Sequence, residues 1–470
     1  MIERFVSTDT IFALASAPGR AGVAVIRVSG PSAGDVLRDI CSLSALPEPR
    51  RTIRCRMVDP VDGGPLDDGL AIWFAGPASF TGEDVAELHI HGGRATIEAV
   101  TGALAALPGL RLAEPGEFSK RAFLAGKIDL TEAEAIADLV DAGTDAQRRQ
   151  ALAQLGGGLA DRLEGWRAEL IDILAHTEAW IDFPDEDLPA DVERAARARI
   201  SALEGEIRAF LDDNRRGERL RDGLQIAILG APNAGKSSLL NAIAAREAAI
   251  VSATEGTTRD VIEVHLDLGG WPVTIADTAG LREAADEIER EGVRRALDRA
   301  GTADLRLVVF DCSRAPDAAS MAQLGDGTGA VLAIANKADL TDQPAAEIAG
   351  VSALGISAKT GAGLPELLQR LETLAAEMMA AGAGASGAGA SGAGGAGGAE
   401  VPLTRLRHRV ALMDSADALA RAATEGPGAG DSELVAEDLR VAARALGRVT
   451  GRVDVEDLLD VIFNDFCIGK

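Results

Sequence analysis

The chain has 470 residues, of which 47% are hydrophobic, so its length corresponds to about three domains of ~150 residues each. Its net charge of −26 and isoelectric point near 4.6 argue against nucleic-acid binding through a broadly basic surface. The sequence has no long apolar run and no signal-peptide pattern at its start, so we expect a cytoplasmic protein without membrane spans.

The composition leaves two interpretations of the acidity open. The chain has no tyrosine and only 3% aromatic residues, so side chains on which bases can stack are scarce. If RNA is the target, a local basic patch or a partner protein must hold it. Otherwise the acidity concerns solubility alone.

In chain order, the sequence predicts several domains of α/β and α+β class. Residues 1–125 alternate β-rich runs such as GVAVIRVSG with helical patterns, which predicts an α+β domain. Residues 126–217 have the periodicity of long helices. Residues 218–379 alternate strands with helices, which is typical of a mostly parallel sheet flanked by helices. Within that region VIEVHLDL, Gly269, Gly270 and WPVTIAD predict a hairpin with one antiparallel edge strand.

The last part of the chain is expected to complete the helical domain. Residues 380–400 are almost wholly Gly, Ala and Ser, which predicts a flexible linker. Residues 401–470 have a helical pattern but are too few to form a strong core alone. We therefore expect them to pack on residues 126–217, with the 218–379 domain inserted between the two helical parts.

A phosphate-binding motif begins at Gly230. GAPNAGKS fits the pattern G-x-x-x-x-G-K-[ST] and lies between a predicted strand and a predicted helix. Lys236 can supply positive charge to the β and γ phosphate oxygens, and the Ser237 hydroxyl can ligate magnesium. Thr258 is placed to reach magnesium and the γ-phosphate, and Asp277 can hold the metal through water.

Two later motifs predict that the base is guanine, and hence that the nucleotide is GTP. In Asn336-Lys337-Ala338-Asp339 the Asp339 carboxylate can accept hydrogen bonds from N1 and the exocyclic amine of guanine, which adenine cannot donate together. Ser357-Ala358-Lys359 can present backbone N–H groups to the guanine oxygen. The expected GTP-binding residues are Asn233, Ala234, Gly235, Lys236, Ser237, Ser238, Ser252, Thr254, Thr257, Thr258, Asp277, Thr278, Ala279, Gly280, Asn336, Lys337, Asp339, Ser357, Ala358 and Lys359.

The machinery for hydrolysis departs from that of Ras-like proteins. The position where those proteins place a water-orienting Gln is Leu281. The nearest acidic groups are Glu283, Asp286, Glu287 and Glu289, most of which we expect on a solvated helix face. No arginine finger is evident, and the Asn233 carbonyl could instead help to hold a monovalent cation against the phosphates, aided by residues 252–257.

With these motifs, the blocks GRAGVAVIRVSG, FTGEDVAELHIHGG, PGEFSKRAF, KIDLTEAEAIADLVDA and the terminal FCIGK resemble the tRNA modification GTPase family, known as MnmE or TrmE, along the whole chain. The resemblance implies a homodimer whose nucleotide domains pair in the transition state, with potassium in place of an arginine finger. It implies a potassium site at Asn233, Ser252, Thr254 and Thr257, and Glu289 as the residue that orients water.

The resemblance also implies an amino-terminal domain that binds a one-carbon folate, 5-formyl- or methylene-tetrahydrofolate, through Arg27, Glu87, Lys127 and Lys470. The Cys467 thiol would serve the tRNA chemistry. An FAD-dependent partner, MnmG or GidA, would join in a heterotetramer to add a carboxymethylaminomethyl or aminomethyl group to carbon 5 of the wobble uridine. The alternative is a GTP-dependent switch in ribosome or RNA assembly without modification chemistry.

Overall fold

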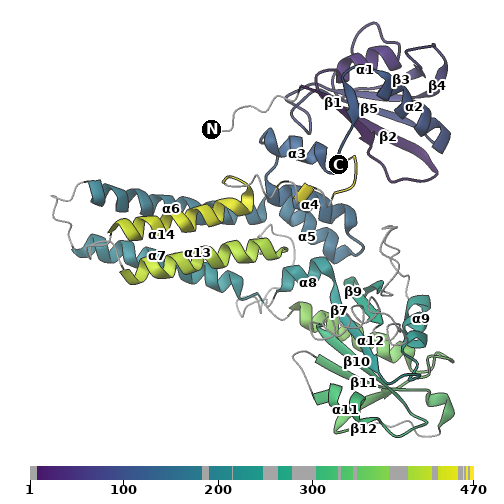
Figure 1. The fold of residues 1–470 in the computed structure, drawn as a ribbon, viewed down its shortest axis with the longest axis vertical. Coiled ribbons are helices and arrows are strands. Elements are labelled where there is room, and N and C mark those ends of the chain that lie inside the picture. Colours follow the sequence, from purple (N-terminus) through teal and green to yellow (C-terminus); the bar gives the residue numbers. More distant parts are fainter. Residues whose placement is uncertain are drawn as a thin grey trace, which may run out of the picture. The chain divides into compact units, whose positions relative to one another are not determined.

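Figure 1 shows the computed structural model of the chain, which describes residues 8–182, 190–213, 215–246, 263–277, 303–325, 330–341, 347–380, 401–425, 432–453, 459, 462–463 and 466–469. The chain forms two compact units. One contains Met1–Ala137 and Leu446–Lys470, and the other contains Asp138–Ala445. Among the described helices, none is long and apolar enough to cross a membrane.

The first unit contains a six-stranded sheet in the order β3-β4-β5-β2-β1-β6. β1 and β6 pair in parallel and the other neighbours pair antiparallel. Together with its helices, this sheet confirms the predicted α+β class. The strands are β1 (Thr10–Leu14), β2 (Ala21–Ser29), β3 (Thr52–Val58), β4 (Pro65–Phe74), β5 (Val85–Gly92) and β6 (Leu110–Leu112).

The two faces of this sheet differ because side chains alternate along each strand. In β2, Ile26 and Val28 are fully buried in a core that α1 (Ala33–Ile40) and α2 (Arg94–Ala106) help to form. The alternate positions, among them Arg27, point to what we call the second face. Its other residues include Thr52, Arg54, Arg56, Leu70, Ile72, Glu87, His89 and Val25, which pair across the strands.

The end of the chain packs into the same unit. Phe123 of α3 (Glu117–Leu124) and Leu130 at the start of α4 (Leu130–Asp141) share an apolar cluster with Ile462, Phe463 and Phe466. Gly451 is required here, because its φ is +84° and a Cβ would collide with Leu130 and Phe123. The terminal segment is therefore held by the amino-terminal part of the chain.

The second unit contains a set of long helices. α13 (Leu406–Glu425) lies against α7 (Ala190–Leu211), and Arg208 pairs with Asp417 at 3.0 Å, so this part of the late helical segment packs on the early one. Residues Leu446–Lys470, which we expected in the same helical domain, instead belong to the first unit. A capping box at Thr144 and Gln147 begins α5 (Asp145–Leu155). The remaining helices here are α6 (Gly158–Asp182) and α8 (Arg216–Asp222), while α14 (Ser432–Thr450) starts in this unit.

A seven-stranded sheet in the order β12-β13-β11-β10-β7-β9-β8 completes the second unit. β13, β11, β10, β7 and β9 run parallel, and β8 pairs antiparallel with β9 at the edge, which confirms the predicted hairpin. Gly269 and Gly270 turn that hairpin with φ of +62° and +91°. The elements are β7 (Leu224–Gly230), α9 (Lys236–Arg246), β8 (Glu263–Leu268), β9 (Trp271–Asp277), β10 (Leu305–Asp311), α11 (Ala318–Gly325), β11 (Ala330–Asn336), β12 (Glu347–Ile348), β13 (Val351–Gly355) and α12 (Leu364–Ala380).

Candidate functional site

The phosphate loop joins β7 to α9, as its sequence predicts. Gly230 has φ +136°, and a Cβ there would collide with the Val309 carbonyl of the neighbouring strand. Gly235 has φ +95°, and its Cβ would collide with the Asn336 amide. Both positions therefore require glycine. Because glycine has no Cβ, the backbone can turn tightly there and lead into the N-terminus of α9.

Lys236 lies across this loop. Its Nζ donates hydrogen bonds to the carbonyl oxygens of Gly230 at 2.9 Å and Ala231 at 2.8 Å, and the residue is only 7% exposed. Ser237 and Ser238 follow at the exposed start of α9, and Asn233 is exposed with φ +63°. An ammonium and a hydroxyl held beside turned backbone suit the binding of phosphate and magnesium.

The predicted base-recognition motifs meet the phosphate loop through Asn336, which is 2% exposed. Its Nδ2 donates to the Ala234 carbonyl at 2.8 Å and its Oδ1 accepts from the Ala358 N–H at 3.0 Å. The Ser357 hydroxyl donates to the exposed Asp339 carboxylate at 2.6 Å and so orients it. One buried amide thus connects three loops that are separate in the sequence.

Of the backbone N–H groups predicted to face the guanine oxygen, two have protein acceptors in this structure. The Ser357 N–H donates to Ala362 and the Ala358 N–H donates to Asn336. Lys359 follows directly. The N–H groups of Ser357 and Ala358 therefore stabilise the loop that would hold the base.

Asp311 is a member of this site that the sequence reasoning missed. Its carboxylate accepts a hydrogen bond from Lys337 Nζ at 2.6 Å. Burial alone would raise the pKa of Asp311, but hydrogen bonds from Lys337 and Ser313 outweigh it and lower the pKa to about 2. Asp311 ends β10 directly beside Asn336 at the end of β11. The position of Asp311 at the end of a predicted strand was a usable signal, because the carboxyl ends of adjacent parallel strands meet at one edge of the sheet.

Several predicted site residues lie outside the described part of the chain, so their predictions stand untested. They are Ser252, Thr254, Thr257, Thr258, Thr278, Ala279, Gly280, Leu281, Glu283, Asp286, Glu287, Glu289 and Lys470; for Asp277, the backbone at the end of β9 is described but the side chain is not.

A second cluster of predicted residues lies on the second face of the amino-terminal sheet. Arg27 and Glu87 are paired residues of β2 and β5, and Arg27 Nε and Nη2 donate to Glu87 Oε1 at 3.1 and 3.0 Å. The Arg27 guanidinium also lies 5.8 and 5.7 Å from the ring centres of Phe80 and Phe118. A cation held between two rings and a carboxylate can bind a planar, anionic ligand.

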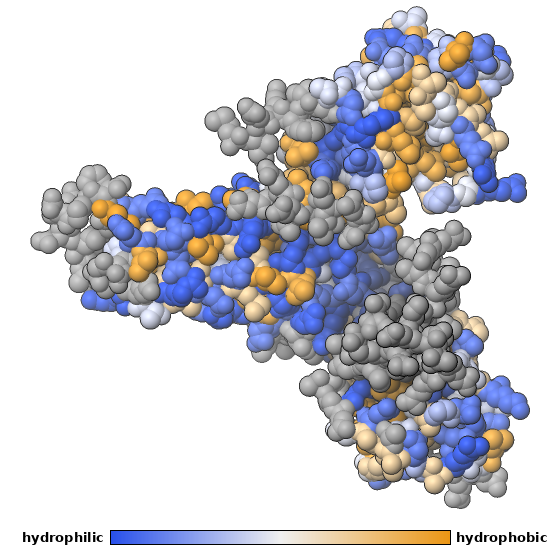
Figure 2. Space-filling view, viewed as in Figure 1, coloured by the Kyte–Doolittle hydropathy of each residue, from blue (hydrophilic) through white to orange (hydrophobic). Residues whose placement is uncertain are grey.

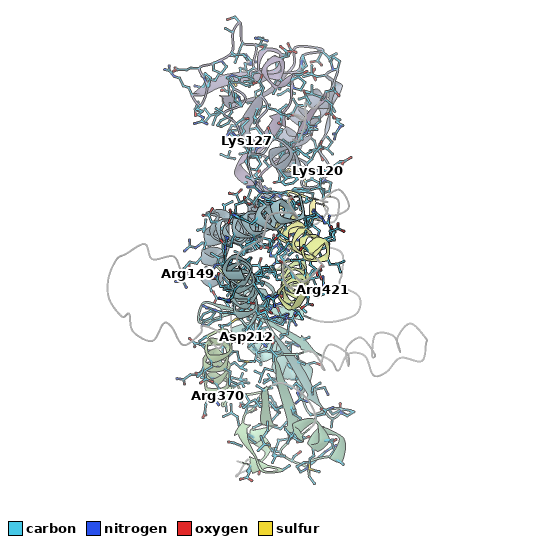
Figure 3. All side chains as sticks on the ribbon, turned by 90° about the vertical axis from the view of Figure 1, so that its left-hand side faces the viewer. Lys120, Lys127, Arg149, Asp212, Arg370 and Arg421 are labelled. Atoms are coloured by element: carbon cyan, nitrogen blue, oxygen red, sulfur yellow. The ribbon has the colours of Figure 1, made fainter. Side chains whose placement is uncertain are left out.

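Lys127, labelled in Figure 3, contacts the loop that carries Phe80. Its Nζ donates to the Pro77 carbonyl at 3.0 Å, and its side chain also approaches Gly82, which has φ +77°. The loop between β4 and β5 therefore contacts both Arg27 and Lys127, the two described basic residues that are predicted to bind folate.

The terminal segment approaches the same sheet. Cys467 is exposed, its carbonyl accepts from the Gly116 N–H at 3.4 Å, and Ile468 forms a β-bridge with Pro115. Gly469 has φ +103°, and a Cβ there would collide with the Leu14 carbonyl. Leu14 follows the β1 residue that pairs with Arg27, so residues near opposite ends of the chain come together.

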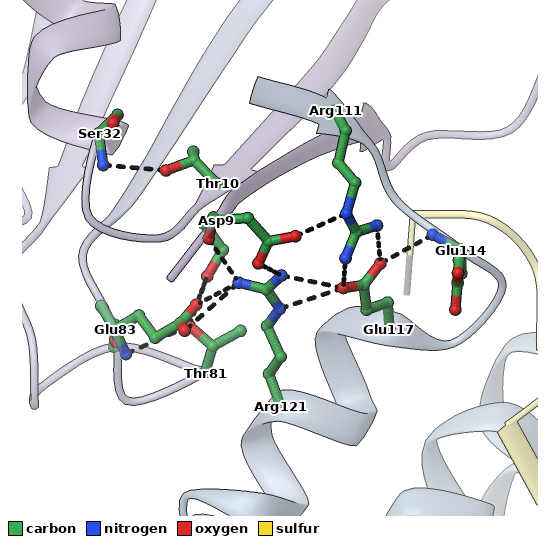
Figure 4. Close-up of polar contacts among 11 residues, drawn as sticks. Asp9, Thr10, Ser32, Thr81, Glu83, Arg111, Glu114, Glu117 and Arg121 are labelled. Carbon is green, nitrogen blue, oxygen red and sulfur yellow. Dashed lines mark hydrogen bonds and ion pairs between the residues drawn. The ribbon is translucent and has the colours of Figure 1, made fainter. Parts of the chain in front are cut away.

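A network of charges around the buried Arg121 (Figure 4) fixes the turn at Gly116, whose N–H donates to the Cys467 carbonyl. Arg121, 4% exposed, pairs with Asp9 at 2.9 Å, Glu117 at 2.9 Å and Glu83 at 3.2 Å. Glu117 in turn accepts from Arg111 and from the Glu114 N–H at 2.9 Å. Burial would raise the pKa of Glu117, but these hydrogen bonds from Arg111, Glu114 and Arg121 outweigh it, so the pKa is lowered.

The parallel sheet, phosphate loop and linked base-recognition loops define a guanine-nucleotide-binding protein with additional domains. Family comparisons match residues 130–467 to the MnmE helical domain and residues 10–127 to the GTP-binding protein TrmE N-terminus. The chain therefore belongs to the tRNA modification GTPase family MnmE/TrmE, which confirms the resemblance inferred from its motifs.

Whole-length relatives agree with this assignment. The tRNA modification GTPase MnmE of Paramagnetospirillum magneticum is 57% identical over 98% of this chain and 100% of its own length. The protein of the same name from Parvibaculum lavamentivorans is 55% identical with the same coverage, and that of Rhodospirillum rubrum is 56% identical over 99% of this chain.

Proposed function

We propose that this chain is a potassium-dependent GTPase that modifies tRNA. With an FAD-dependent partner it adds a carboxymethylaminomethyl or aminomethyl group to carbon 5 of the wobble uridine, using a tetrahydrofolate one-carbon donor. The observation that carries the proposal is the presence of two separate sites: the phosphate loop with its base-recognition loops, and the Arg27–Glu87 cluster in the same compact unit as the exposed Cys467. Family membership supports both.

The nucleotide site supports GTP hydrolysis. Lys236 and the loop backbone hold the phosphates, Ser237 and Thr258 ligate magnesium, and Asp339 selects guanine. Asn233, Ser252, Thr254 and Thr257 form the potassium site, and Glu289 orients water. The exposed Asn233 side chain on a left-handed backbone fits a cation ligand at the loop. Turnover should be much higher in potassium than in sodium, and equal rates would remove the cation from the mechanism.

The amino-terminal site fits a one-carbon folate. Arg27, Lys127 and Lys470 would hold its anionic tail and flat ring system, and Glu87 would accept hydrogen bonds from its pterin. The folate supplies the one-carbon unit when bound. The exposed ring of Phe80 beside Arg27 adds flat apolar surface for such a ligand, whereas the buried Phe118 ring supports the guanidinium from within. Cys467, exposed on the segment whose Gly469 approaches Leu14 of β1, is the thiol that serves the tRNA chemistry.

We further propose a cytoplasmic homodimer that joins the FAD-dependent partner in a heterotetramer, with the nucleotide domains pairing during hydrolysis. The domain boundaries we assign are 1–125, 126–217, 218–379, 380–400 and 401–470. The two-part helical domain is supported by the packing of α13 on α7. The acidic surface leaves much of the RNA contact to the partner.

Reconstitution with purified components tests this function. Unmodified tRNA, GTP, methylene-tetrahydrofolate, a nitrogen source and the FAD-dependent protein are combined with the chain, and the nucleosides are analysed by mass. We expect a modified wobble uridine that disappears when any component is omitted. A product that forms without this chain would instead favour a GTP-dependent switch in RNA assembly, and one that forms without GTP would contradict the coupling of hydrolysis to modification.

A further inference from the structure

Four arginines occur within seven residues in the sequence RRTIRCR, residues 50–56, of a chain whose net charge is −26. In β3, Arg54 and Arg56 are exposed on the second face, whereas Cys55 and Met57 are buried in the core. We propose that Arg50, Arg51, Arg54 and Arg56, here called the arginine strand, bind the phosphate backbone of the tRNA. This inference rests on the proposed function, which makes tRNA the substrate.

The charges of the arginine strand are accessible. The Arg54 side chain is 78% exposed and donates to both Asp68 oxygens, at 3.0 and 2.7 Å. Arg51 pairs with Glu48 at 3.3 Å. Ion pairs this exposed are weak and screened by salt, so phosphates can compete for these guanidinium groups. Within the described part of the chain, Arg56 makes no ion pair.

Two arginines of another arginine-rich segment, RLRHR at residues 405–409, are engaged inside the protein. Arg409 is 13% exposed and pairs with Asp213 at 2.6 Å and Glu218 at 2.9 Å. Arg405, 16% exposed, pairs with Asp138 at 2.7 Å. These pairs hold helices of the second unit together and offer little charge to a ligand. The arginine strand therefore offers more accessible positive charge than this segment, as the local basic patch of an acidic RNA-binding chain must.

The arginine strand lies where it could hold the tRNA backbone while the target base reaches the site at Arg27. Arg54 pairs across the sheet with Leu70, which pairs with His89, which pairs with Val25 of β2. Three strand spacings of about 4.8 Å put the arginine strand roughly 14 Å from β2, on the same face as Arg27. Enzymes that act on RNA bases hold the backbone while the target base is turned out of the stack.

Two other roles predict different results. Charged residues on an edge strand prevent pairing between sheets, and β3 is an edge strand. The face also has an exposed apolar residue, Leu70 at 42%, and Figure 2 shows apolar side chains on the visible surface of this domain, which would suit a second copy of the chain. Each alternative predicts changed self-association without changed RNA affinity.

The test is the salt dependence of tRNA binding by the full-length chain. A labelled, unmodified tRNA transcript is titrated by fluorescence anisotropy in KCl from about 50 to 200 mM. The double variant Arg54→Gln, Arg56→Gln should bind about tenfold or more weakly, with the slope of log K against log salt reduced by about 1.5 to 2. Asp68→Asn should tighten binding, because it removes the competing carboxylate.

Arg94→Gln is the matched control. Arg94 is also an exposed, ion-paired arginine, but it lies on α2, which packs on the opposite side of the sheet. It should leave affinity and slope unchanged. The proposal is wrong if the double variant keeps the wild-type slope, or if it sediments differently while binding RNA normally. Because the assay involves neither folate nor GTP, its failure would leave the modification chemistry untouched.

Discussion

The nucleotide site and the amino-terminal site are built in different ways. The first consists of loops at the ends of adjacent parallel strands, where the buried Asn336 bonds to Ala234 and Ala358. The second takes Arg27 and Glu87 from strand interiors, Lys127 from beyond α3 and Cys467 from the end of the chain. Backbone geometry holds the first site, whereas packing and buried charges from distant segments hold the second. The second is therefore more sensitive to substitutions far from its ligand.

The largest expected effect is that of Cys467→Ser, a substitution at the amino-terminal site alone. Cys467→Ser should abolish the modification of wobble uridine, because a serine hydroxyl without an activating base is a far weaker nucleophile than a thiol at neutral pH. Cys467 is exposed, so the melting temperature should not change. Nucleoside mass analysis of tRNA from cells carrying the variant measures the effect. Normal modification would exclude the thiol from the chemistry, and a lowered melting temperature would indicate a folding role.

Arg121→Leu tests the dependence of the amino-terminal site on buried charge. It leaves Asp9, Glu83 and Glu117 without their shared cation, so we expect a loss of about 3 kcal/mol in the unfolding free energy of this unit. Modification should fall as well, because the turn that contacts Cys467 loses its support.

Arg121→Lys should restore part of both properties. The thiol reactivity of Cys467 gives a readout beyond stability, since its rate of alkylation should change in the Leu variant below the melting temperature. Arg94→Leu, which removes an exposed pair, should change neither stability nor reactivity. Wild-type stability in Arg121→Leu would contradict the assigned role of the network.

At the nucleotide site, Asp339→Asn should lower GTP affinity about 100-fold and move the preference to xanthosine nucleotides, since the amide donates where the carboxylate accepts. The variant should still fold, because Asp339 is exposed and, among the described residues, its carboxylate accepts a hydrogen bond only from the Ser357 hydroxyl. Titration with both labelled nucleotides measures the change. Retained GTP affinity would refute the assignment of base selection.

Asp311→Asn should have a smaller effect at the same site. It weakens the pair with Lys337, and GTP affinity should fall by about fivefold, close to 1 kcal/mol. Because the pKa of Asp311 is lowered to about 2, its stabilising contribution is complete above about pH 4 and is lost as the pH falls toward 2. Melting temperatures from pH 5 to 2 should fall less in the variant. A parallel fall in both proteins would remove this pair from the acid response.

These two sites also explain what the sequence could predict. The phosphate loop and the guanine motifs are short and contiguous, so strand, loop and helix could be predicted from their residues, including the Gly269–Gly270 hairpin. Asp311 was missed because it belongs to no motif and acts only through its neighbour on the next strand. The Arg121 network joins Asp9 just before β1, Arg111 of β6, α3 and a loop, and no spacing in the sequence brings those segments together.

The most direct test of the central claim is nucleoside mass analysis of tRNA from a strain that lacks this chain. We expect the wobble uridine to lose its carboxymethylaminomethyl or aminomethyl group, and the wild-type chain supplied on a plasmid to restore it. Unchanged wobble uridines in the deletion strain would contradict the account and leave a GTPase with another role.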